Sequence, residues 1–349
     1  MSVSKYAYVY ARIRARMGDM LDERKLRTLV DARNKDDFLS SLMDSPYKDK
    51  LTKATSDDLR DTERALKEEL IDQYLMVLLS TGGEVRALLE ELFRRFEVAN
   101  LKTVVAARAT GVVTTEELPF PSVDDFFGRR IRGLMEEDSV ESVMKQLKDP
   151  YRSILEEVFP EYKKSNRILI LESALDDELY GAIWNRMKRL AEEDKKIVRR
   201  IVGTEVDIAN LMTLLRCKLD GIEEKELRSF FFPYNSSLDL AAPSAKAAVS
   251  ANDVRSAIQM LPPSVYKDAL TDALPEYEEE NSLIPFEKSL KKLFLSTIKH
   301  TLRGYPFNIG AIMSFLYLEE IEIRNLCAIA VSKENEIPPE EITRSIIVY

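Results

Sequence analysis

The amino-acid sequence predicts an all-α protein made of three similar helical domains. Three observations support this: the composition, apolar residues at helical spacing, and one sequence pattern that occurs three times. The chain has 349 residues but only 11 Gly and 14 Pro, few for a phosphate-loop α/β enzyme or a β-sandwich. Apolar residues make up 45% and charged residues 32%, as in a soluble globular protein with ample material for a core. This length allows two or three domains.

The repeated pattern centres on an Asn-Leu pair. An acidic residue lies three positions before each Asn, and a basic residue lies eight positions after it. The Asn residues are 110 and 115 positions apart, which is close to even spacing. The acids are Glu97, Asp207 and Glu322, the amides are Asn100, Asn210 and Asn325, and the bases are Arg108, Lys218 and Lys333.

Two further landmarks occur in the same order before each Asn. Tyrosines lie 53, 59 and 59 positions ahead, at Tyr47, Tyr151 and Tyr266. A Glu-x-x-Leu motif lies 37, 38 and 38 positions ahead, beginning at Glu63, Glu172 and Glu287. The sequence therefore predicts three helical repeats, at 1–122, 123–235 and 236–349. The third repeat opens with an Ala- and Ser-rich linker at 236–252, which offers little to anchor it.

Apolar spacing indicates that each repeat is helical. In 84–109 the apolar residues recur at steps of three and four, the signature of a helix with one buried face. Gly111 and Gly221 follow the periodic run, and Asn335 occupies nearly the same place in the third repeat; such residues end helices in the left-handed conformation. Residues 6–17 fit either a strand or a helix, and we expect a helix. The prolines predict a break between two helices early in each repeat: Pro46, Pro150 and Pro262-Pro263.

The acid and base of the pattern do not predict a catalytic pair. On a helix they lie within ~20° of one another but ~16 Å apart, too far to share a substrate. The bases fall in a final helical turn, where a cation complements the helix dipole. The acids can bond a neighbouring helix or its exposed amides. We expect the Asn side chains to be buried amides that fix helix–helix register, with ligand contact as the alternative.

We expect no catalytic, metal or cofactor site. His300 is the only histidine and has no acidic or thiol cluster around it in the sequence, while Cys217 and Cys327 occupy different places in the repeat. Nucleotide-loop, dinucleotide, hydrolase and zinc-protease motifs are absent from the sequence. A formal net charge of −9 argues against a nucleic-acid partner. The aromatic run 230–234 is expected to fill the seam between repeats, or alternatively to face a partner.

The sequence contains no stretch of the ~20 apolar residues that a membrane span requires. The N-terminus also lacks the apolar region and cleavage site of a signal peptide. We therefore expect a cytoplasmic protein that is able to dock on a membrane complex.

The repeated Asn-Leu segments resemble the C subunit of the archaeal-type (A/V-type) rotary ATPases, a family related to the d subunit of vacuolar ATPases. The resemblance runs from end to end. The third repeat departs from the pattern at Cys327 and Ser332, and Glu336 replaces the stop glycine. The matching stretches are Tyr6–Arg16, Glu97–Thr103 with Arg108–Gly111, Tyr305–Gly310, Glu322–Leu326 and Ile337–Ile342.

The resemblance implies three helical domains around a pseudo-threefold axis, arranged as a funnel. The protein would be a non-catalytic central-stalk subunit of a proton- or sodium-translocating ATPase or ATP synthase, peripheral on the cytoplasmic side of the membrane and without a cofactor. Its partners would be the D- and F-type stalk subunits and the c/K-type membrane rotor ring, with no nucleic acid and no membrane span of its own.

A symmetric ring or an axial stalk would meet the three repeats similarly, so the six repeated polar residues are candidate partner positions: Arg108, Lys218, Lys333, Asn100, Asn210 and Asn325. The alternatives are a free-standing helical scaffold, disfavoured because solenoid repeats run ~20–45 residues, and a helical enzyme with an interdomain site that uses His300.

Overall fold

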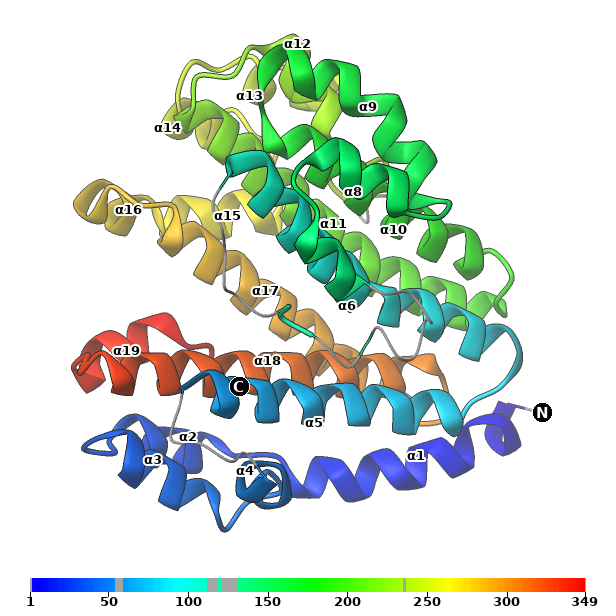
Figure 1. Cartoon of the computed structure of the whole chain (residues 1–349), viewed down its shortest axis with the longest axis vertical. Coiled ribbons are helices and arrows are strands. Elements are labelled where there is room, and N and C mark those ends of the chain that lie inside the picture. The colour runs from blue at the N-terminus through cyan, green and yellow to red at the C-terminus, as the bar shows by residue number, and fades with distance from the viewer. Residues whose placement is uncertain are drawn as a thin grey trace. The chain divides into compact units, whose positions relative to one another are not determined.

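A computed structural model describes residues 2–53, 59–111, 118–120, 123, 131–234 and 237–348. Within these ranges every regular element is an α-helix or a short 3₁₀ turn, which confirms the predicted all-α class (Figure 1). The chain divides into two compact units. Unit 1 comprises 1–10, 190–318 and 347–349, and unit 2 comprises 11–189 and 319–346. The predicted domain boundaries at 122/123 and 235/236 fall on or beside residues outside the described ranges.

Unit 2 contains the helices of the first half of the chain and the end of the last long helix. It holds the second half of α1 (Ser2–Asp19) and the C-terminal part of α18 (Ile309–Glu334). Its other elements are α2 (Glu23–Val30), α3 (Lys35–Leu42), α4 (Lys48–Lys53), α5 (Leu59–Leu79), α6 (Gly83–Thr110), η1 (Ile131–Glu136), α8 (Val140–Gln146), α9 (Tyr151–Ser165), α10 (Ile168–Met187) and α19 (Pro339–Ser345).

Unit 1 contains the second long helix and the helices that follow it, together with the starts of α1 and α18. Its other elements are α11 (Glu192–Leu219), α12 (Glu224–Leu227), η2 (Arg228–Phe230), η3 (Pro243–Ala245), α13 (Lys246–Val249), α14 (Val254–Gln259), α15 (Val265–Asp272), α16 (Leu274–Glu280) and α17 (Ile284–Leu302).

The three longest helices carry the repeated pattern. α6, α11 and α18 span 28, 28 and 26 residues, and each holds its Asn in the second half. Each long helix buries an apolar face; in α6 this face includes Leu88, Leu92 and Phe96. The repeated Asn residues therefore occupy equivalent places in equivalent elements, as the spacing predicted.

Packing joins the first two long helices to helices that come later in the chain. In unit 2, α10 lies along α6, and α9 packs on α10. In unit 1, α17 packs on α11, and α15 packs on α17. The predicted helix breaks at the prolines are confirmed, since α3 and α4, α8 and α9, and α14 and α15 are each separated at those residues.

The left-handed helix stops are confirmed in the first two repeats, and in the third repeat Glu336 holds the equivalent position, eleven residues after the Asn. Gly111 and Gly221 have φ of 67° and 66°. After α11, the Ile222 N–H donates to the Cys217 carbonyl at 2.9 Å, which is the hydrogen bond of a Schellman motif. The expectation for Asn335 is wrong: Glu336, with φ of 55°, takes the left-handed position, and the Ile337 N–H donates to the Ser332 carbonyl.

The prediction of a loosely anchored linker at 236–252 is also wrong for its described residues. Leu238, Leu240 and Val249 are buried, and the segment contains η3 and α13. Its small alanines make it compact rather than flexible, because Ala245 and Ala248 are also fully buried. Ala and Ser content indicated flexibility, but burial of these small side chains against the rest of unit 1 overrides that tendency.

The N-terminal stretch is helical, as expected, with Tyr6, Val9 and Ile13 buried along one face of α1. The tyrosines that alternate in the sequence therefore point to different faces of one helix, not to one side of a strand. Among the described residues, none of the helices combines the length and the apolar character needed to cross a bilayer.

The left-handed stop of α18 predicts a stabilising substitution. Glu336→Gly relieves the strain of a side chain at positive φ, so we expect the free energy of unfolding to rise by about 1 kcal/mol. The matched opposite change is Gly221→Ala at the same position after α11, which should lower it by about 1 kcal/mol. Urea denaturation of both variants measures the two effects. Equal stability of Glu336→Gly and the wild type would contradict this account of the helix stop.

Candidate functional site

Buried tyrosine–carboxylate hydrogen bonds connect the repeats. The Tyr151 hydroxyl donates to Glu97 at 2.6 Å, and the Tyr266 hydroxyl donates to Asp207 at 2.7 Å. The Tyr47 hydroxyl donates to Glu322. All six side chains are at most 2% exposed. The acid of each repeat thus meets the tyrosine of the next one, and the acid of the third meets the tyrosine of the first.

The carboxylates gain further donors from backbone amides. Asp207 accepts hydrogen bonds from the N–H groups of Ser237, at 3.1 Å, and Leu238, at 3.4 Å. Glu322 accepts one from the N–H of Leu21 at 2.9 Å. The expected bond to a neighbouring helix is made by the tyrosines of α9 and α15, whereas these amides belong to non-helical segments rather than to helix ends. A buried carboxylate needs such donors, because an unpaired charge in the interior is costly.

The hydroxyls remain protonated donors. Burial, together with the neighbouring carboxylate, raises the pKa of Tyr151 and of Tyr266 above the ordinary tyrosine value. A hydroxyl that stays protonated at physiological pH can only donate to a carboxylate beside it. The two pairs therefore act as fixed, charge-assisted hydrogen bonds.

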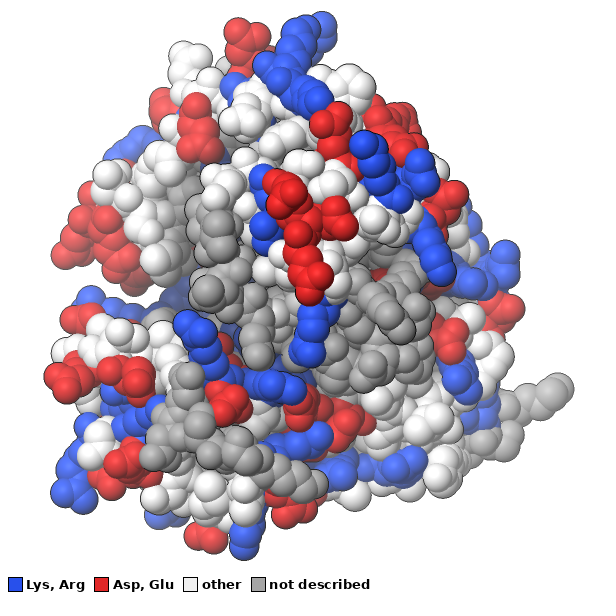
Figure 2. All heavy atoms as spheres, viewed as in Figure 1, with Lys and Arg blue, Asp and Glu red and all other residues white. Residues whose placement is uncertain are grey.

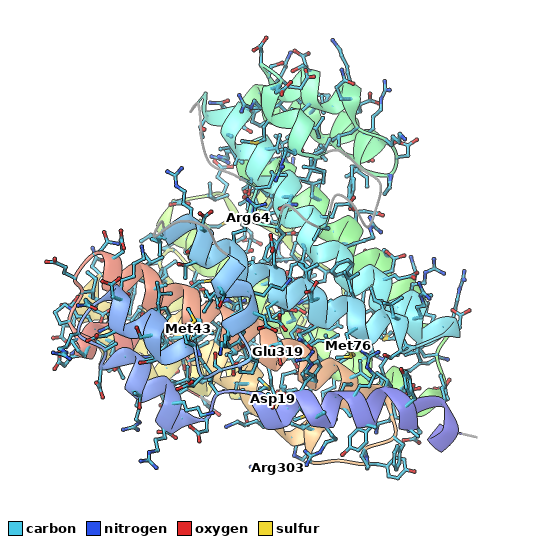
Figure 3. The ribbon with its side chains drawn as sticks, turned by 60° about the horizontal axis from the view of Figure 1, so that its bottom comes forward. Asp19, Met43, Arg64, Met76, Arg303 and Glu319 are labelled. Atoms are coloured by element: carbon cyan, nitrogen blue, oxygen red, sulfur yellow. The ribbon has the colours of Figure 1, made fainter. Side chains whose placement is uncertain are left out.

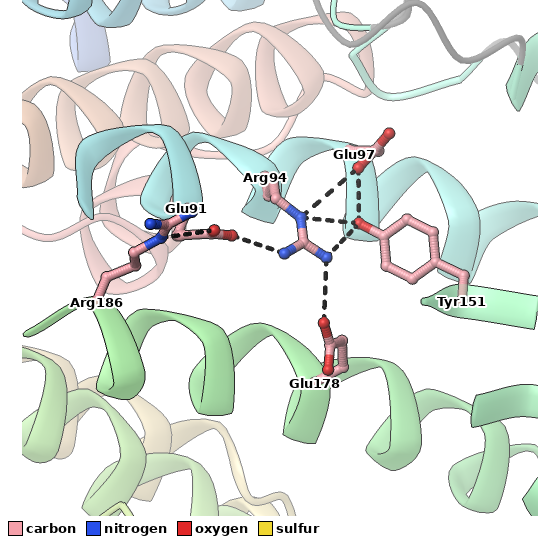
Figure 4. Close-up of polar contacts among 6 residues, drawn as sticks. All are labelled: Glu91, Arg94, Glu97, Tyr151, Glu178 and Arg186. Atoms are coloured by element: carbon pink, nitrogen blue, oxygen red, sulfur yellow. Dashed lines mark hydrogen bonds and ion pairs between the residues drawn. The ribbon is translucent and has the colours of Figure 1, made fainter. Parts of the chain in front are cut away.

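The first pair belongs to a wider ionic network that is shown in Figure 4. Arg94 donates to Glu91 at 2.6 Å and to the Tyr151 hydroxyl at 3.2 Å, and it lies 3.6 Å from Glu178. Arg186 in turn lies 3.4 Å from Glu91. The network joins α6 to α9 and α10 with charges of both signs. Burial raises the pKa of Glu178, and the negative charge of Glu91 adds to this effect. The positive charge of Arg94 lowers the pKa but does not outweigh burial.

The residue three positions before the acid differs among the three pairs. Arg94 holds this position in α6, Thr204 holds it in α11, and Glu319 holds it in α18. Thr204 donates its hydroxyl to the Arg200 carbonyl at 2.6 Å. The neighbour at this position is thus a cation in the first pair, a neutral hydroxyl in the second and a second acid in the third.

Glu319 is a buried acid among other acids. It is 5% exposed and lies in the field of Glu322, Glu69 and Asp19, which the cation Arg16 opposes. Figure 3 labels Glu319 and Asp19 in the part of unit 2 that α1 crosses. Burial first, and the neighbouring carboxylates second, raise the pKa of Glu319 well above the ordinary glutamate value.

The repeated Asn residues hold the chain that leaves each long helix. The Asn100 amide donates to the Phe120 carbonyl at 2.8 Å and accepts from the Phe120 N–H at 2.9 Å. Asn210 makes the same two bonds to Phe232, at 2.9 and 2.8 Å. Asn325 is 3% exposed. The prediction of a buried amide is confirmed, but for Asn100 and Asn210 the expected partner was wrong: the amide fixes a following non-helical segment rather than a second helix.

Two of the repeated bases also contact backbone. Arg108 donates to the Met135 carbonyl at 2.9 Å, and Lys218 donates to the Val249 carbonyl at 2.6 Å. Burial lowers the pKa of Lys218. Lys333 is only 7% exposed. Each base lies in the last turn of its helix, as predicted, and the first two brace the chain downstream of it.

The sequence analysis did not predict that the tyrosines bond the acids. It also did not identify Arg94 and Glu319 as neighbours of these pairs. Their signal is present in the repeat: the second and third tyrosine landmarks follow the acid of the preceding repeat by 54 and 59 residues, and position −3 to the acid varies in charge. The tyrosine and the acid of one repeat do not bond each other. The bonds form between different repeats, so the order of landmarks within a repeat does not indicate them.

The remaining candidates do not assemble into a site. His300 is exposed in the last turn of α17, and burial raises the pKa of the Cys327 thiol to about 12. Cys217 is buried. The aromatic run is inward-facing at Phe230 and Phe232, both buried. Among the described residues no group of His, Cys, Asp and Glu could hold a metal ion.

Charges on the described surface are mixed rather than segregated. Figure 2 shows blue basic and red acidic side chains interspersed over the face that it draws. Many belong to pairs one helical turn apart, such as Arg27 with Glu23 and Arg152 with Glu156. Such exposed pairs contribute little to stability and are typical of solvated helices.

Together these features define a class of helical repeat protein. Its repeated polar residues form hydrogen bonds with buried side chains and backbone groups of the same chain. The family model of the ATP synthase (C/AC39) subunit matches residues 9–345, and the chain belongs to this family.

Curated relatives match the chain over nearly its full length. The A-type ATP synthase C subunit of Methanobrevibacter smithii is 30% identical over 352 residues, 99% of this chain and 89% of the relative. The protein of the same name from Methanosphaera stadtmanae is 28% identical over 99% of this chain and 89% of its own length. That of Halorubrum lacusprofundi is 27% identical over 98% of this chain and 97% of its own length.

The tyrosine–carboxylate pairs predict a specific loss of stability. Tyr266→Phe removes one charge-assisted donor from buried Asp207, so we expect the free energy of unfolding to fall by about 1.5–3 kcal/mol. Tyr305→Phe is the matched control, because Tyr305 is 57% exposed, and it should change stability by less than ~0.5 kcal/mol. Urea denaturation gives both values. If Tyr266→Phe is as stable as the control, the pair has no role in stability.

The raised pKa of Glu319 predicts a pH-dependent effect of its own. A carboxyl with a folded-state pKa above its unfolded value stabilises the fold at low pH, and this contribution is lost as the pH rises above the unfolded value. We therefore expect Glu319→Gln to raise the melting temperature at pH 8 and to have a smaller effect as the pH falls toward about 4.5, the ordinary glutamate value. Exposed Glu340→Gln is the control. A pH-independent difference for Glu319→Gln would refute the assignment.

Proposed function

We propose that the chain is the C subunit of an archaeal-type rotary ATPase or ATP synthase. In this proposal it is a non-catalytic socket on the cytoplasmic side of the membrane that couples the central stalk to a proton- or sodium-carrying rotor ring. The observation that carries the proposal is the family match over residues 9–345, and relatives named as the C subunit of A-type ATP synthase extend over nearly the same span.

The repeated polar contacts support a threefold organisation for such a socket. The acid of each long helix accepts a tyrosine hydroxyl from another repeat, and in two repeats the Asn bonds the backbone of a later phenylalanine. We infer three domains of this composition, arranged as a funnel around a pseudo-threefold axis. A funnel of this kind has a central cavity into which the helices of a stalk fit.

Transmission of torque also favours this construction. A rotor adapter must not slip between its modules, and apolar packing by itself is non-directional. Buried hydrogen bonds to charged groups are directional and are expensive to break, because breakage leaves a charge without a partner. The pairs at Glu97, Asp207 and Glu322 would therefore keep the helices in register under load.

The bonded state of these acids argues against an enzyme with an interdomain site. Glu97, Asp207 and Glu322 are buried and already accept hydrogen bonds from the protein. A general base needs access to a substrate proton. This arrangement supports the interpretation of the chain as a non-catalytic subunit.

The partners in this proposal are the D- and F-type stalk subunits on one face and the c/K-type ring on the other. Arg108, Lys218 and Lys333 remain the proposed equivalent positions at which partners meet the repeats, whereas Asn100, Asn210 and Asn325 are buried and do not reach the surface. The backbone bonds of Arg108 and Lys218 favour the alternative that these bases brace the fold.

Charge reversal tests both the function and these positions. Wild-type protein should capture both the purified stalk pair and the detergent-solubilised ring. The variant Arg108→Glu, Lys218→Glu, Lys333→Glu should lose at least one partner if the bases contact it. The control Arg24→Glu, Lys145→Glu, Lys164→Glu makes the same charge change at exposed sites and should keep both.

The outcomes of the capture experiment are distinct, with circular dichroism reporting whether each variant is folded. If the folded triple variant binds both partners like wild type, the three bases only brace the fold. If wild-type protein binds neither partner, the proposed function itself is wrong.

A further inference from the structure

One end of unit 1 carries exposed tyrosines among exposed basic side chains. It is formed by the start of α1, the first turns of α11, the end of α17 and the segment 303–308 that precedes α18. We call it the aromatic–basic patch and define it by six exposed residues: Lys5, Tyr8, Lys196, Arg200, Arg303 and Tyr305.

Buried polar bonds hold these segments together. Asp194, at the start of α11, accepts the Tyr6 hydroxyl at 2.5 Å and the Ile309 N–H at 3.1 Å. Arg200 donates to the Thr301 hydroxyl at 3.2 Å, which joins α11 to the last turn of α17. The patch is therefore a fixed surface of one unit rather than a set of independent side chains.

The aromatic rings of the patch support one another. Phe307 lies edge-on to Tyr10, with ring centroids 5.4 Å apart, and edge-on to Tyr305 at 5.8 Å. Tyr8 is 63% exposed and Tyr305 is 57% exposed, although tyrosine side chains are large and partly apolar. Isolated exposed apolar residues are ordinary, but Tyr305 extends a packed aromatic pair to the surface, and aromatic residues beside cations are characteristic of a contact surface.

The charge of the patch is opposite to that of the whole chain. The chain has a formal net charge of −9, whereas Lys5, Lys196, Arg200 and Arg303 are exposed here and cationic. Arg303, labelled in Figure 3, follows the last turn of α17.

Acidic residues at the start of α11 offset little of this charge. Asp194 is buried and bonded, and Lys5 lies 4.0 Å from it. Glu192 pairs with Lys195 at 2.7 Å, and Glu193 is exposed at the edge. The patch therefore presents a basic surface to a partner.

We propose that the aromatic–basic patch binds an anionic phospholipid surface. Tyrosine has an apolar ring and a polar hydroxyl, so it favours the headgroup level of a membrane. Lysine and arginine place long apolar stems along such a surface and their charges on its phosphates. The choice of a lipid partner rests on the proposed function, which places the chain beside a membrane rotor.

Other occupants fit the patch less well. Single-stranded nucleic acid is bound by aromatic faces open to base stacking, whereas Phe307 is packed between two tyrosines here. An acidic protein surface would also use the cations and the tyrosines, and lipid is favoured over it because the proposed function places the chain beside a membrane. The binding assays distinguish these occupants from lipid.

Co-sedimentation of the full-length chain with vesicles tests the proposal. Phosphatidylcholine vesicles with and without ~30% phosphatidylglycerol provide anionic and neutral surfaces of the same size, since anionic lipid supplies the attraction. The variant Lys196→Gln, Arg303→Gln removes two patch charges. The control Arg24→Gln, Lys25→Gln removes two exposed charges on α2, outside the patch. A second variant, Tyr8→Ser, Tyr305→Ser, removes the exposed rings but no charge.

We expect the wild type and the charge control to bind anionic vesicles, to bind neutral vesicles weakly, and to release at about 0.5 M salt, where charges are strongly screened. The double charge variant should bind about 30-fold more weakly, given the contribution of each basic residue near an anionic surface. The tyrosine variant should also bind more weakly at low salt. Circular dichroism establishes that each variant is folded.

Three results would overturn the proposal: no binding of wild type to anionic vesicles, equal binding to neutral ones, or equal loss in patch and control variants. Capture of a lipid-free acidic partner or of an oligonucleotide that depends on the patch, without vesicle binding, would reassign it to that partner. These results are separate from the capture of stalk and ring, so failure here leaves the proposed function standing.

Discussion

Hydrogen bonds between buried tyrosines and buried carboxylates decide how the long helices of this protein pack. A carboxylate in the middle of a long helix cannot be buried without donors. Glu97, Asp207 and Glu322 are each buried because a tyrosine from another repeat lies against them. The bond fixes which helices meet and in what register. Apolar packing along α6 and α10, and along α11 and α17, then follows in that register.

The charged residues around the tyrosine–carboxylate pair differ from one repeat to the next. Arg94 surrounds the first pair with ionic partners, whereas Glu319 adds a second buried acid beside the third. The carboxyl of Glu319 is accommodated by its raised pKa, and Arg94 is held by three carboxylates and a hydroxyl. The surroundings of the three tyrosine–carboxylate pairs can therefore differ in their response to pH.

Much of the fold could be predicted from the sequence because its signals are local. Helical periodicity, the prolines before α4, α9 and α15, and the glycine stops at 111 and 221 each act within a few residues. The pairing of Tyr266 with Asp207 could not be predicted in the same way, since 59 residues separate them and only tertiary packing joins them. The composition of 236–252 led to the wrong expectation of a loosely anchored linker, because its buried alanines form part of a compact segment. Asn100 and Asn210 were correctly expected to be buried, but their partner lies in a segment without regular spacing.

A double-mutant cycle measures whether Tyr266 and Asp207 stabilise the fold through the bond between them. The free energies of unfolding of Tyr266→Phe, Asp207→Asn and the double variant are compared with that of wild type. If the pair holds the repeats together, the two single losses overlap, and the coupling energy is about 1 kcal/mol or more. Additive losses, with coupling below ~0.5 kcal/mol, would contradict the claim and assign the stability of the fold to apolar packing alone.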